Sequence, residues 1–120
     1  MKKKYTVSDL FSGAGGLSQG FVQAGFKLLA GIDNYDPALI TYQHNIKGAV
    51  ALKENLYNAE ASIIDVKKHL HGKAPDVIIA GPPCQGFSLT GNRDINDSRN
   101  TLYVAVVKFV RYFKPRAFLI

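Results

Sequence analysis

The only cysteine of the chain, Cys84, has the surroundings that most favour covalent chemistry. It stands in the stretch Pro82-Pro83-Cys84-Gln85-Gly86-Phe87-Ser88, directly after an apolar run, residues 75–80, that predicts a strand. A thiolate is a strong nucleophile and a workable leaving group, so it suits covalent catalysis. Most free cysteines are buried and inert, and that alternative stays open, but a rigid turn at a strand end favours the nucleophile.

Two further features follow other predicted strands. The turn Ser12-Gly13-Ala14-Gly15-Gly16 comes after residues 5–11, and its glycines would let the backbone approach a ligand closely. Its G-x-G-G spacing falls short of the dinucleotide signature G-x-G-x-x-G, so a ligand-free strand–helix turn remains an alternative. Asp33 ends the apolar run 27–32, where a carboxylate can accept hydrogen bonds from both ribose hydroxyls; a turn aspartate beside Asn34 is the alternative. Together the two features favour an adenosine-type cofactor.

Strand-like and helix-like segments alternate along the chain, which predicts βαβ units around a parallel sheet. Strands are predicted at residues 5–11, 27–32, 61–66, 75–80 and 117–120, and helices at 17–25 and Asp36–Asn45, the latter with Asp36 as its N-cap. Thr101–Phe113 fits a helix, although its Val and Phe content leaves a strand open. Residues 47–61 show no clear pattern, and 86–100 are expected to be irregular. Open α/β sheets bind ligands beyond the carboxyl ends of their strands, so the three features should meet there.

Length and composition limit what else the chain can be. Its 120 residues suffice for one domain whose core needs no disulfide or zinc, and one cysteine alone forms neither. We therefore expect no metal and a reducing, cytoplasmic setting. No apolar run approaches the roughly 18–20 residues of a transmembrane helix, so no membrane partner is expected. The net charge of +6 favours polyanionic partners. Arg93 and Arg99 are the candidates for phosphate contacts, although a solvated helix face would explain part of the basic excess from 93 to 116.

Two stretches together resemble the first and fourth sequence motifs of the C5-cytosine DNA methyltransferases. One runs from Asp9 to Gly16, and the other is Gly81 to Ser88, GPPCQGFS. The resemblance covers essentially the whole chain in the family's order, through Phe21, Gly25-Phe26, Asp33, Asp65-Val66, residues 97–102 and Phe118-Leu119-Ile120. It implies an α/β fold with the Rossmann-like, mostly parallel sheet of S-adenosylmethionine-dependent methyltransferases, incomplete here with about five strands.

The resemblance also implies roles for individual residues, with S-adenosylmethionine as cofactor and duplex DNA as partner. Asn34 departs from the bulky residue that commonly follows the ribose acid in the family, and no role is carried over to it. The implied cofactor contacts are Phe11 on the adenine, the backbone of Ser12, Gly13, Ala14, Gly15 and Gly16 around the methionine part, Asp33 on the ribose, Asp65 and Val66 at the adenine edge, Pro82, and Leu102 closing over the cofactor. Cys84 is the implied nucleophile, Pro83 helps to orient the cytosine, and Gln85, Ser88, Arg93 and Arg99 would face the DNA.

The chemistry of the family explains why a thiol is needed. Addition of Cys84 to C6 of cytosine makes C5 enamine-like, so that C5 can attack a sulfonium methyl group. Loss of the C5 proton and of the thiol then restores the base. Stacking hides C6 in duplex DNA, so the base must be flipped out. Residues 85–99 would form a lid over it; a surface loop without a gating role is the alternative.

In the family, the strand that resembles Phe118-Leu119-Ile120 runs into a Glu-Asn-Val motif whose glutamate protonates cytosine N3. We therefore expect residues 1–120 to be the N-terminal part of a cofactor-binding and catalytic domain, without the target-recognition domain and the C-terminal motifs. The expected function is DNA cytosine-5 methylation in a restriction–modification system, with a complementing C-terminal polypeptide as partner and no activity of this chain alone. Two alternatives remain: a transfer-RNA cytosine-5 methyltransferase and a non-catalytic nucleotide-binding scaffold module.

Overall fold

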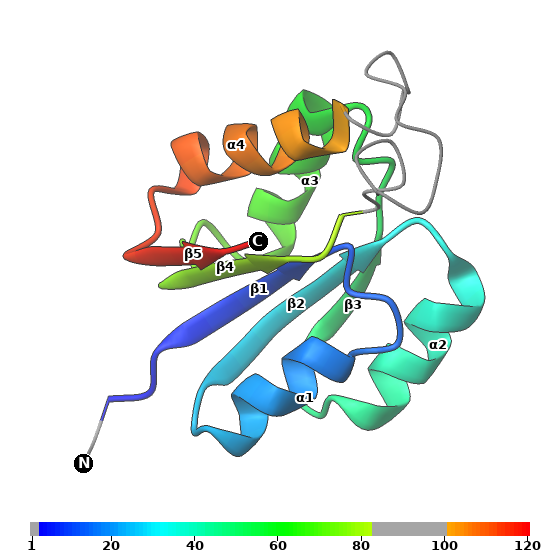
Figure 1. The fold of residues 1–120 in the computed structure, drawn as a ribbon, viewed down its shortest axis with the longest axis vertical. Helices are drawn as coiled ribbons and strands as arrows, with labels where there is room; N and C mark the ends of the chain where they lie inside the picture. Colours follow the sequence, from blue (N-terminus) through cyan, green and yellow to red (C-terminus); the bar gives the residue numbers. More distant parts are fainter. Residues whose placement is uncertain (1–2, 83–100) are drawn as a thin grey trace, which may run out of the picture.

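A computed structural model describes residues 3–82 and 101–120, and in these residues four helices flank one five-stranded sheet. The strands are β1 (Thr6–Leu10), β2 (Lys27–Asp33), β3 (Val50–Lys53), β4 (Val77–Ala80) and β5 (Ala117–Leu119), and the helices are α1 (Gly16–Gln23), α2 (Asp36–Asn45), α3 (Ala59–His69) and α4 (Thr101–Phe113). All pairings are parallel, in the order β3-β2-β1-β4-β5 (Figure 1). The predicted α/β, Rossmann-like sheet of about five strands is confirmed.

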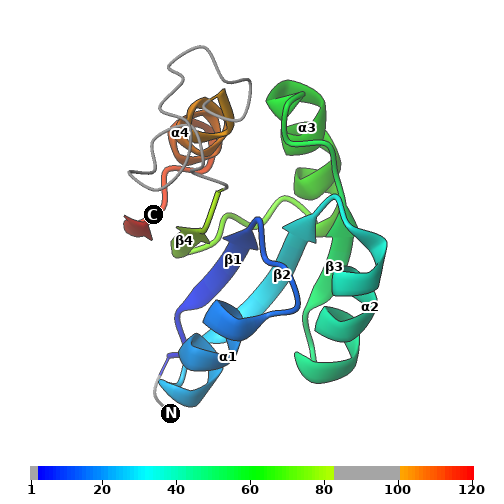
Figure 2. The same cartoon turned by 45° about the vertical axis from the view of Figure 1, so that its right-hand side comes forward.

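The helices cover both faces of the sheet, with α1 and α2 on one face and α3 and α4 on the other (Figure 1, Figure 2). Each face has its own core. Leu10, Ile32 and Ile78 belong to the core beneath α3 and α4, whereas Val7 and Ile79 belong to the core beneath α1 and α2. Burial on both faces explains why β2 and β4 are nearly continuous apolar runs instead of alternating patterns.

The strand order reverses between β1 and β4. From β1 the chain builds outward through β2 to β3, and it then returns to place β4 on the other side of β1. Open α/β sheets bind ligands at such a reversal, beyond the carboxyl ends of the strands. Here the amide of Gly81, directly after β4, donates to the carbonyl of Leu10 over 3.3 Å. The chain therefore leaves β1 and β4 at neighbouring points of one edge.

The strand predicted at residues 61–66 is wrong, because these residues belong to α3 and the third strand is β3. Ile64 is 64% exposed, and Asn58 caps the helix by accepting the amide hydrogen of Ala61 over 3.3 Å. The β-branched pair at 63–64 imitates a strand locally, whereas β3 has four residues with only Leu52 buried, too short for a visible pattern. The buried residues of α3 recur at helical spacing: Ala59, Ser62, Ile63 and Val66.

Two smaller expectations are decided at α2 and α4. Asp36 is not the N-cap of α2: Tyr35 holds that position without a side-chain hydrogen bond, and the Asp36 carboxylate instead pairs with Lys53 Nζ at 2.8 Å.

Thr101–Phe113 is a helix, since its buried residues are spaced by three or four: Leu102, Ala105, Val106, Phe109 and Phe113. None of the described helices is long and apolar enough to cross a membrane. The expected irregular segment 86–100 lies outside the described residues.

Candidate functional site

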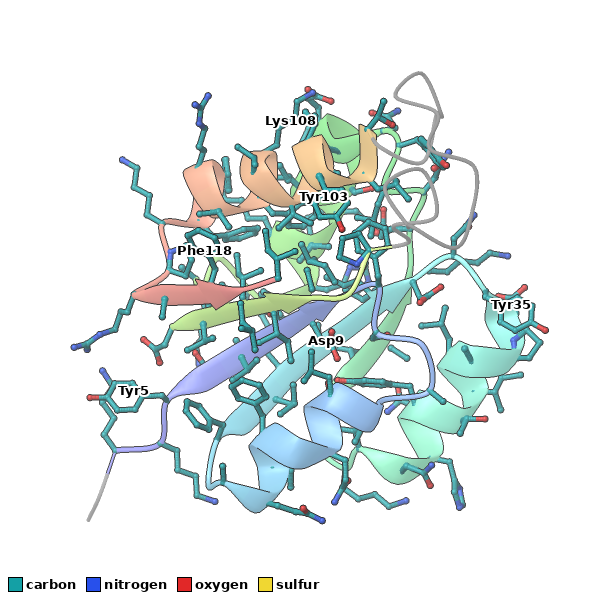
Figure 3. All side chains as sticks on the ribbon, viewed as in Figure 1. Tyr5, Asp9, Tyr35, Tyr103, Lys108 and Phe118 are labelled. Carbon is teal, nitrogen blue, oxygen red and sulfur yellow. The ribbon has the colours of Figure 1, made fainter. Side chains whose placement is uncertain are left out.

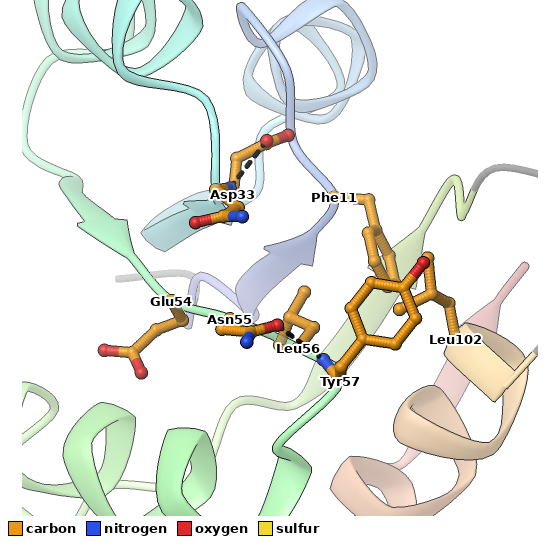
Figure 4. Close-up of a pocket in the computed structure, with 8 residues that line it drawn as sticks. Phe11, Asp33, Glu54, Asn55, Leu56, Tyr57 and Leu102 are labelled. Carbon is orange, nitrogen blue, oxygen red and sulfur yellow. Dashed lines mark hydrogen bonds between the residues drawn. The ribbon is translucent and has the colours of Figure 1, made fainter. Parts of the chain in front are cut away.

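A pocket of about 240 Å³ opens at the carboxyl edge of the sheet, somewhat below the roughly 300–1,000 Å³ of most ligand sites. Its lining comes from the ends of three neighbouring strands and from the first turn of α4: Phe11 after β1, Asp33 and Asn34 at β2, Glu54, Asn55, Leu56 and Tyr57 after β3, and Leu102. Figure 4 shows Phe11, Tyr57 and Leu102 gathered at one end and Asp33 at the other. The pocket thus has an apolar end and a carboxylate end.

The apolar end is built from side chains that pack on the core beneath α3 and α4. Leu56 and Leu102 are buried members of that core, and Phe11 packs against it. The backbone of Phe11 has φ of 56°, a left-handed conformation that costs a non-glycine residue roughly 1–2 kcal/mol. Such strain persists only where surrounding contacts enforce it, and it concentrates at functional sites. The backbone conformation of Phe11 and its packing against the core therefore hold its aromatic ring at the pocket.

At the carboxylate end, Asp33 holds three backbone amides. Its Oδ2 accepts from Gly13 N over 2.8 Å, and its Oδ1 accepts from Asn34 N over 2.7 Å and from Tyr35 N over 3.1 Å. These bonds tie the glycine-rich turn to the end of β2. An ionised carboxylate has about four acceptor positions, so Asp33 keeps capacity for a ligand hydroxyl while it holds the turn.

The glycine-rich turn, residues 12–16, lies beside the pocket and is fixed by its backbone. Ser12 N donates to Ile32 O over 3.0 Å, and Gly15 N donates to Ser12 O over 3.1 Å. Gly15 has φ of 102°, and a Cβ there would lie 2.9 Å from Tyr42 Cδ2, so only glycine fits. A second hollow is lined by Ala14, Gly15 and Gly16 together with residues of α1 and α2. The turn therefore lines this second hollow, while Gly13 is tied to the first pocket through its hydrogen bond to Asp33.

Sequence reasoning missed the residues that follow β3. Glu54 N donates to Asp33 O over 2.9 Å, and Asn55 Oδ1 accepts from Tyr57 N over 3.1 Å, which folds this loop against the pocket. Burial, followed by the hydrogen bond and the repulsion from the Asp65 carboxyl, raises the pKa of Glu54 to about 7. The signal in the sequence was the polar pair Glu54-Asn55 after an apolar run, but the run is too short to identify as a strand.

The structure brings together some of the predicted cofactor residues and separates others. Phe11, Asp33 and Leu102 line one pocket, with the turn beside them. Pro82 is buried just beyond β4 but does not line this pocket. Asp65 and Val66, expected at the adenine edge, do not line this pocket: both lie in α3, and Val66 is 1% exposed within the core.

The remaining predicted site residues lie outside the described part of the chain. They are the nucleophile and its neighbour, Cys84 and Pro83, and the four residues expected to face DNA, Gln85, Ser88, Arg93 and Arg99. Their roles stay predictions, as does the lid at 85–99. Within residues 3–82 and 101–120, no group of three His, Cys, Asp or Glu side chains could hold a metal ion.

The five-stranded parallel sheet with helices on both faces has the Rossmann-like fold of the S-adenosylmethionine-dependent methyltransferases. Within that class, residues 5–120 match the family model of the C-5 cytosine-specific DNA methylases. The chain belongs to this family, whose cofactor is S-adenosylmethionine.

Individual relatives agree with this assignment. The chain is 47% identical over 115 residues to the type II methyltransferase M.AgeI of Thalassovita gelatinovora, a match that covers 93% of the chain and 26% of that protein. It is 41% identical over 107 residues to the type II methyltransferase M.HgiGI of Herpetosiphon aurantiacus, covering 89% of the chain and 81% of the relative. The crystal structure of a DNA modification methyltransferase encoded within an E. coli prophage superposes with a TM-score of 0.74 at 36% identity, over 93% of this chain and 30% of that one. The chain thus spans about a quarter of M.AgeI.

Proposed function

We propose that this chain is the N-terminal, cofactor-binding and nucleophile-bearing part of a DNA cytosine-5 methyltransferase from a restriction–modification system. The observation that carries the proposal is the convergence of Phe11, Asp33 and Leu102 on one pocket in a chain of this family. The complete enzyme would transfer a methyl group from S-adenosylmethionine to C5 of a cytosine in duplex DNA. The target-recognition domain and the later catalytic motifs would come from polypeptide beyond residues 1–120.

The residues of the pocket fit the adenosine part of S-adenosylmethionine. Phe11, Leu56 and Leu102 offer an apolar surface of the kind that packs on a planar ring. Asp33 retains acceptor capacity for a ribose hydroxyl. The hollow at Ala14, Gly15 and Gly16 would take the methionine part against backbone atoms. When bound, the cofactor supplies an electrophilic sulfonium methyl group.

The nucleophile would enter from the end of β4. Gly81 is hydrogen-bonded to the end of β1, and Cys84 follows three residues later in the sequence. Its thiolate would add to C6 of the cytosine, and the C5–C6 electron pair would take up the methyl group, which leaves S-adenosylhomocysteine behind. Loss of the C5 proton to a base would then restore the C5–C6 double bond and expel the thiolate. The pocket residues named above do not share in this bond-making; they bind and orient the donor, while Pro83 orients the base.

A chimera tests the proposal directly. In it, residues of this chain replace the 115 matching residues of M.AgeI, so that the missing portion comes from the relative. With cofactor and duplex DNA carrying 5-fluorocytosine, which has no C5 proton to lose, we expect a covalent protein–DNA adduct. Cys84→Ser should abolish the adduct and leave the binding of S-adenosylhomocysteine unchanged.

Other outcomes separate the alternatives. An adduct with 5-fluorocytosine-substituted transfer RNA but none with DNA would contradict DNA as the substrate. Binding of S-adenosylhomocysteine without an adduct on either nucleic acid would overturn the catalytic role and leave a nucleotide-binding module. The family match to DNA methylases favours an adduct with duplex DNA over both of these outcomes. This chain alone, without the complementing polypeptide, is expected to form no adduct.

A further inference from the structure

A buried polar chain lies directly behind the glycine-rich turn, on the face of the sheet covered by α1 and α2. Its members are Asp9 of β1, Ser18 of α1 and Tyr42 of α2, each at most 1% exposed. Ser18 Oγ donates to Asp9 Oδ2 over 2.6 Å and lies 2.9 Å from Tyr42 Oη. A serine hydroxyl has one hydrogen, so Tyr42 must be the donor to Ser18. Figure 3 shows Asp9 between β1 and α1.

Asp9 anchors a helix that has no capping side chain. The N-cap of α1 is Gly15, which has no side chain, and the first turn contains no acidic residue. Ser18 is the third residue of α1, and its hydroxyl donates to Asp9 Oδ2 over 2.6 Å. A carboxylate from β1 therefore holds the first turn of α1 through a buried side-chain hydrogen bond.

The tyrosine at the other end of the chain fixes the turn sterically. A Cβ on Gly15 would lie 2.9 Å from Tyr42 Cδ2, and a Cβ on Gly31 would overlap Cζ and both Cε atoms of the same ring. The ring thus fills the space between β2 and the turn, and its hydroxyl ends in the hydrogen bond to Ser18. One connected unit joins β1, β2, α1 and α2 beneath residues 12–16.

We propose that Asp9, acting through Ser18 and Tyr42, is a positioning residue of the cofactor site that anchors the first turn of α1 and thereby fixes the turn of residues 12–16. The proposal rests on the proposed function, because it assigns that turn to cofactor binding. Asp9 does not reach the pocket lining itself. What matters is an acceptor at its position, so a neutral side chain of the same shape should serve nearly as well.

The test compares Asp9→Ala, Asp9→Asn and Ser18→Ala, with Asp36→Asn as a matched control at an exposed aspartate outside the network. Hydrogen exchange by NMR reports the protection of the Gly13, Gly15 and Gln19 amides in the free chain, and calorimetry reports the affinity for S-adenosylhomocysteine. In Asp9→Ala we expect both quantities to fall about fivefold or more, the equivalent of one lost buried hydrogen bond. In Ser18→Ala the protection and the affinity should fall less. In Asp9→Asn and Asp36→Asn both should stay within about twofold of their values in the original chain.

Three results would be decisive. Rescue by asparagine with loss in alanine supports the positioning role, whereas equal protection of the turn in all variants overturns it. A lower global stability in Asp9→Ala with unchanged turn protection and affinity would also overturn it, and if Asp9→Ala does not fold, Ser18→Ala carries the same comparison. If the original chain binds no S-adenosylhomocysteine while turn protection still depends on Asp9, the proposed cofactor site fails and the positioning role stands.

Discussion

The turn after β1 and the loop after β3 meet at the same pocket but are held in different ways. The first is fixed by backbone hydrogen bonds, by glycines against the Tyr42 ring and by a buried carboxylate, Asp9. The second has backbone hydrogen bonds only at its two ends, and between them it is held by side chains near the surface. Asn55 accepts from Tyr57 N, and Glu54 lies beside Asp65 of α3. The pocket therefore has one side that tolerates almost no change and one side that can vary.

The largest effect should come from breaking the fixed side. In Gly31→Ala the new methyl group would overlap the buried Tyr42 ring, which has no space to move. We expect a loss of about 3 kcal/mol in the free energy of unfolding by urea, or failure to fold. Gly20→Ala is the matched control, because nothing lies within 4 Å of a Cβ there. That change should stabilise α1 by up to about 1 kcal/mol; equal effects of the two changes would contradict the account.

The charge of Asp9 gives the next effect, and its sign follows from the raised pKa. Burial is the main cause that raises this pKa from 3.8 to about 6, with repulsion from Asp33 adding and the Ser18 hydrogen bonds opposing. The folded state therefore holds the proton more tightly than the unfolded chain, so the stability from Asp9 is full below about pH 4 and is lost as the pH rises through 6. Tyr42, whose pKa burial raises to about 12, stays neutral throughout.

Urea unfolding of the original chain and of Asp9→Asn between about pH 4 and pH 8 measures this effect. The difference in unfolding free energy should shift in favour of asparagine by on the order of 3 kcal/mol across that range, since the pKa rises from 3.8 to about 6. Parallel pH profiles for the two proteins would show that Asp9 does not change charge in the folded state. In Asp9→Asn the amides of the turn 12–16 should keep their protection from exchange, so the stability and the protection of the turn respond separately.

On the variable side, Asn55→Ala removes the acceptor for Tyr57 N and should cost about 1 kcal/mol of stability. Because Asn55 also lines the pocket, the affinity of the variant for S-adenosylhomocysteine should fall as well. Asn58→Ala is the control: it removes the cap of α3, at a similar cost of about 1 kcal/mol, from a residue outside the pocket lining. An equal loss of affinity in both variants would mean that the loop after β3 contributes only stability.

The smallest effect concerns the carboxyl pair next to that loop. In Asp65→Asn the repulsion on Glu54 disappears, so the pKa of Glu54 should fall from about 7 toward its ordinary value. NMR titration of the side-chain carboxyl carbons would measure it, with Asp9 as the internal control that keeps its pKa near 6. A Glu54 pKa that stays near 7 would assign the shift to burial alone.

The same contrast explains what the sequence could predict. The fixed side could be predicted from local patterns, namely a strand, a glycine-rich turn and an aspartate at the end of the next strand. The structure places Phe11 and Asp33 at one pocket, as expected. The variable side depends on tertiary contacts. A four-residue edge strand has no visible periodicity, and the β-branched pair 63–64 led to a strand where Asn58 and the buried face of α3 specify a helix. The contact of Asp9 was equally hidden, because no local rule predicts that a carboxylate of one strand anchors the first turn of a helix through a serine hydroxyl.

The most direct test of the central claim is to map S-adenosylhomocysteine onto the isotopically labelled chain by NMR. The account predicts that the largest amide shifts fall at Phe11, Gly13, Asp33, Leu56 and Leu102, and that Asp33→Ala removes them. Shifts confined to the groove between α4 and β5, lined by Val107, Phe118 and Ile120, would contradict it. So would an Asp33→Ala variant that binds as tightly as the original chain.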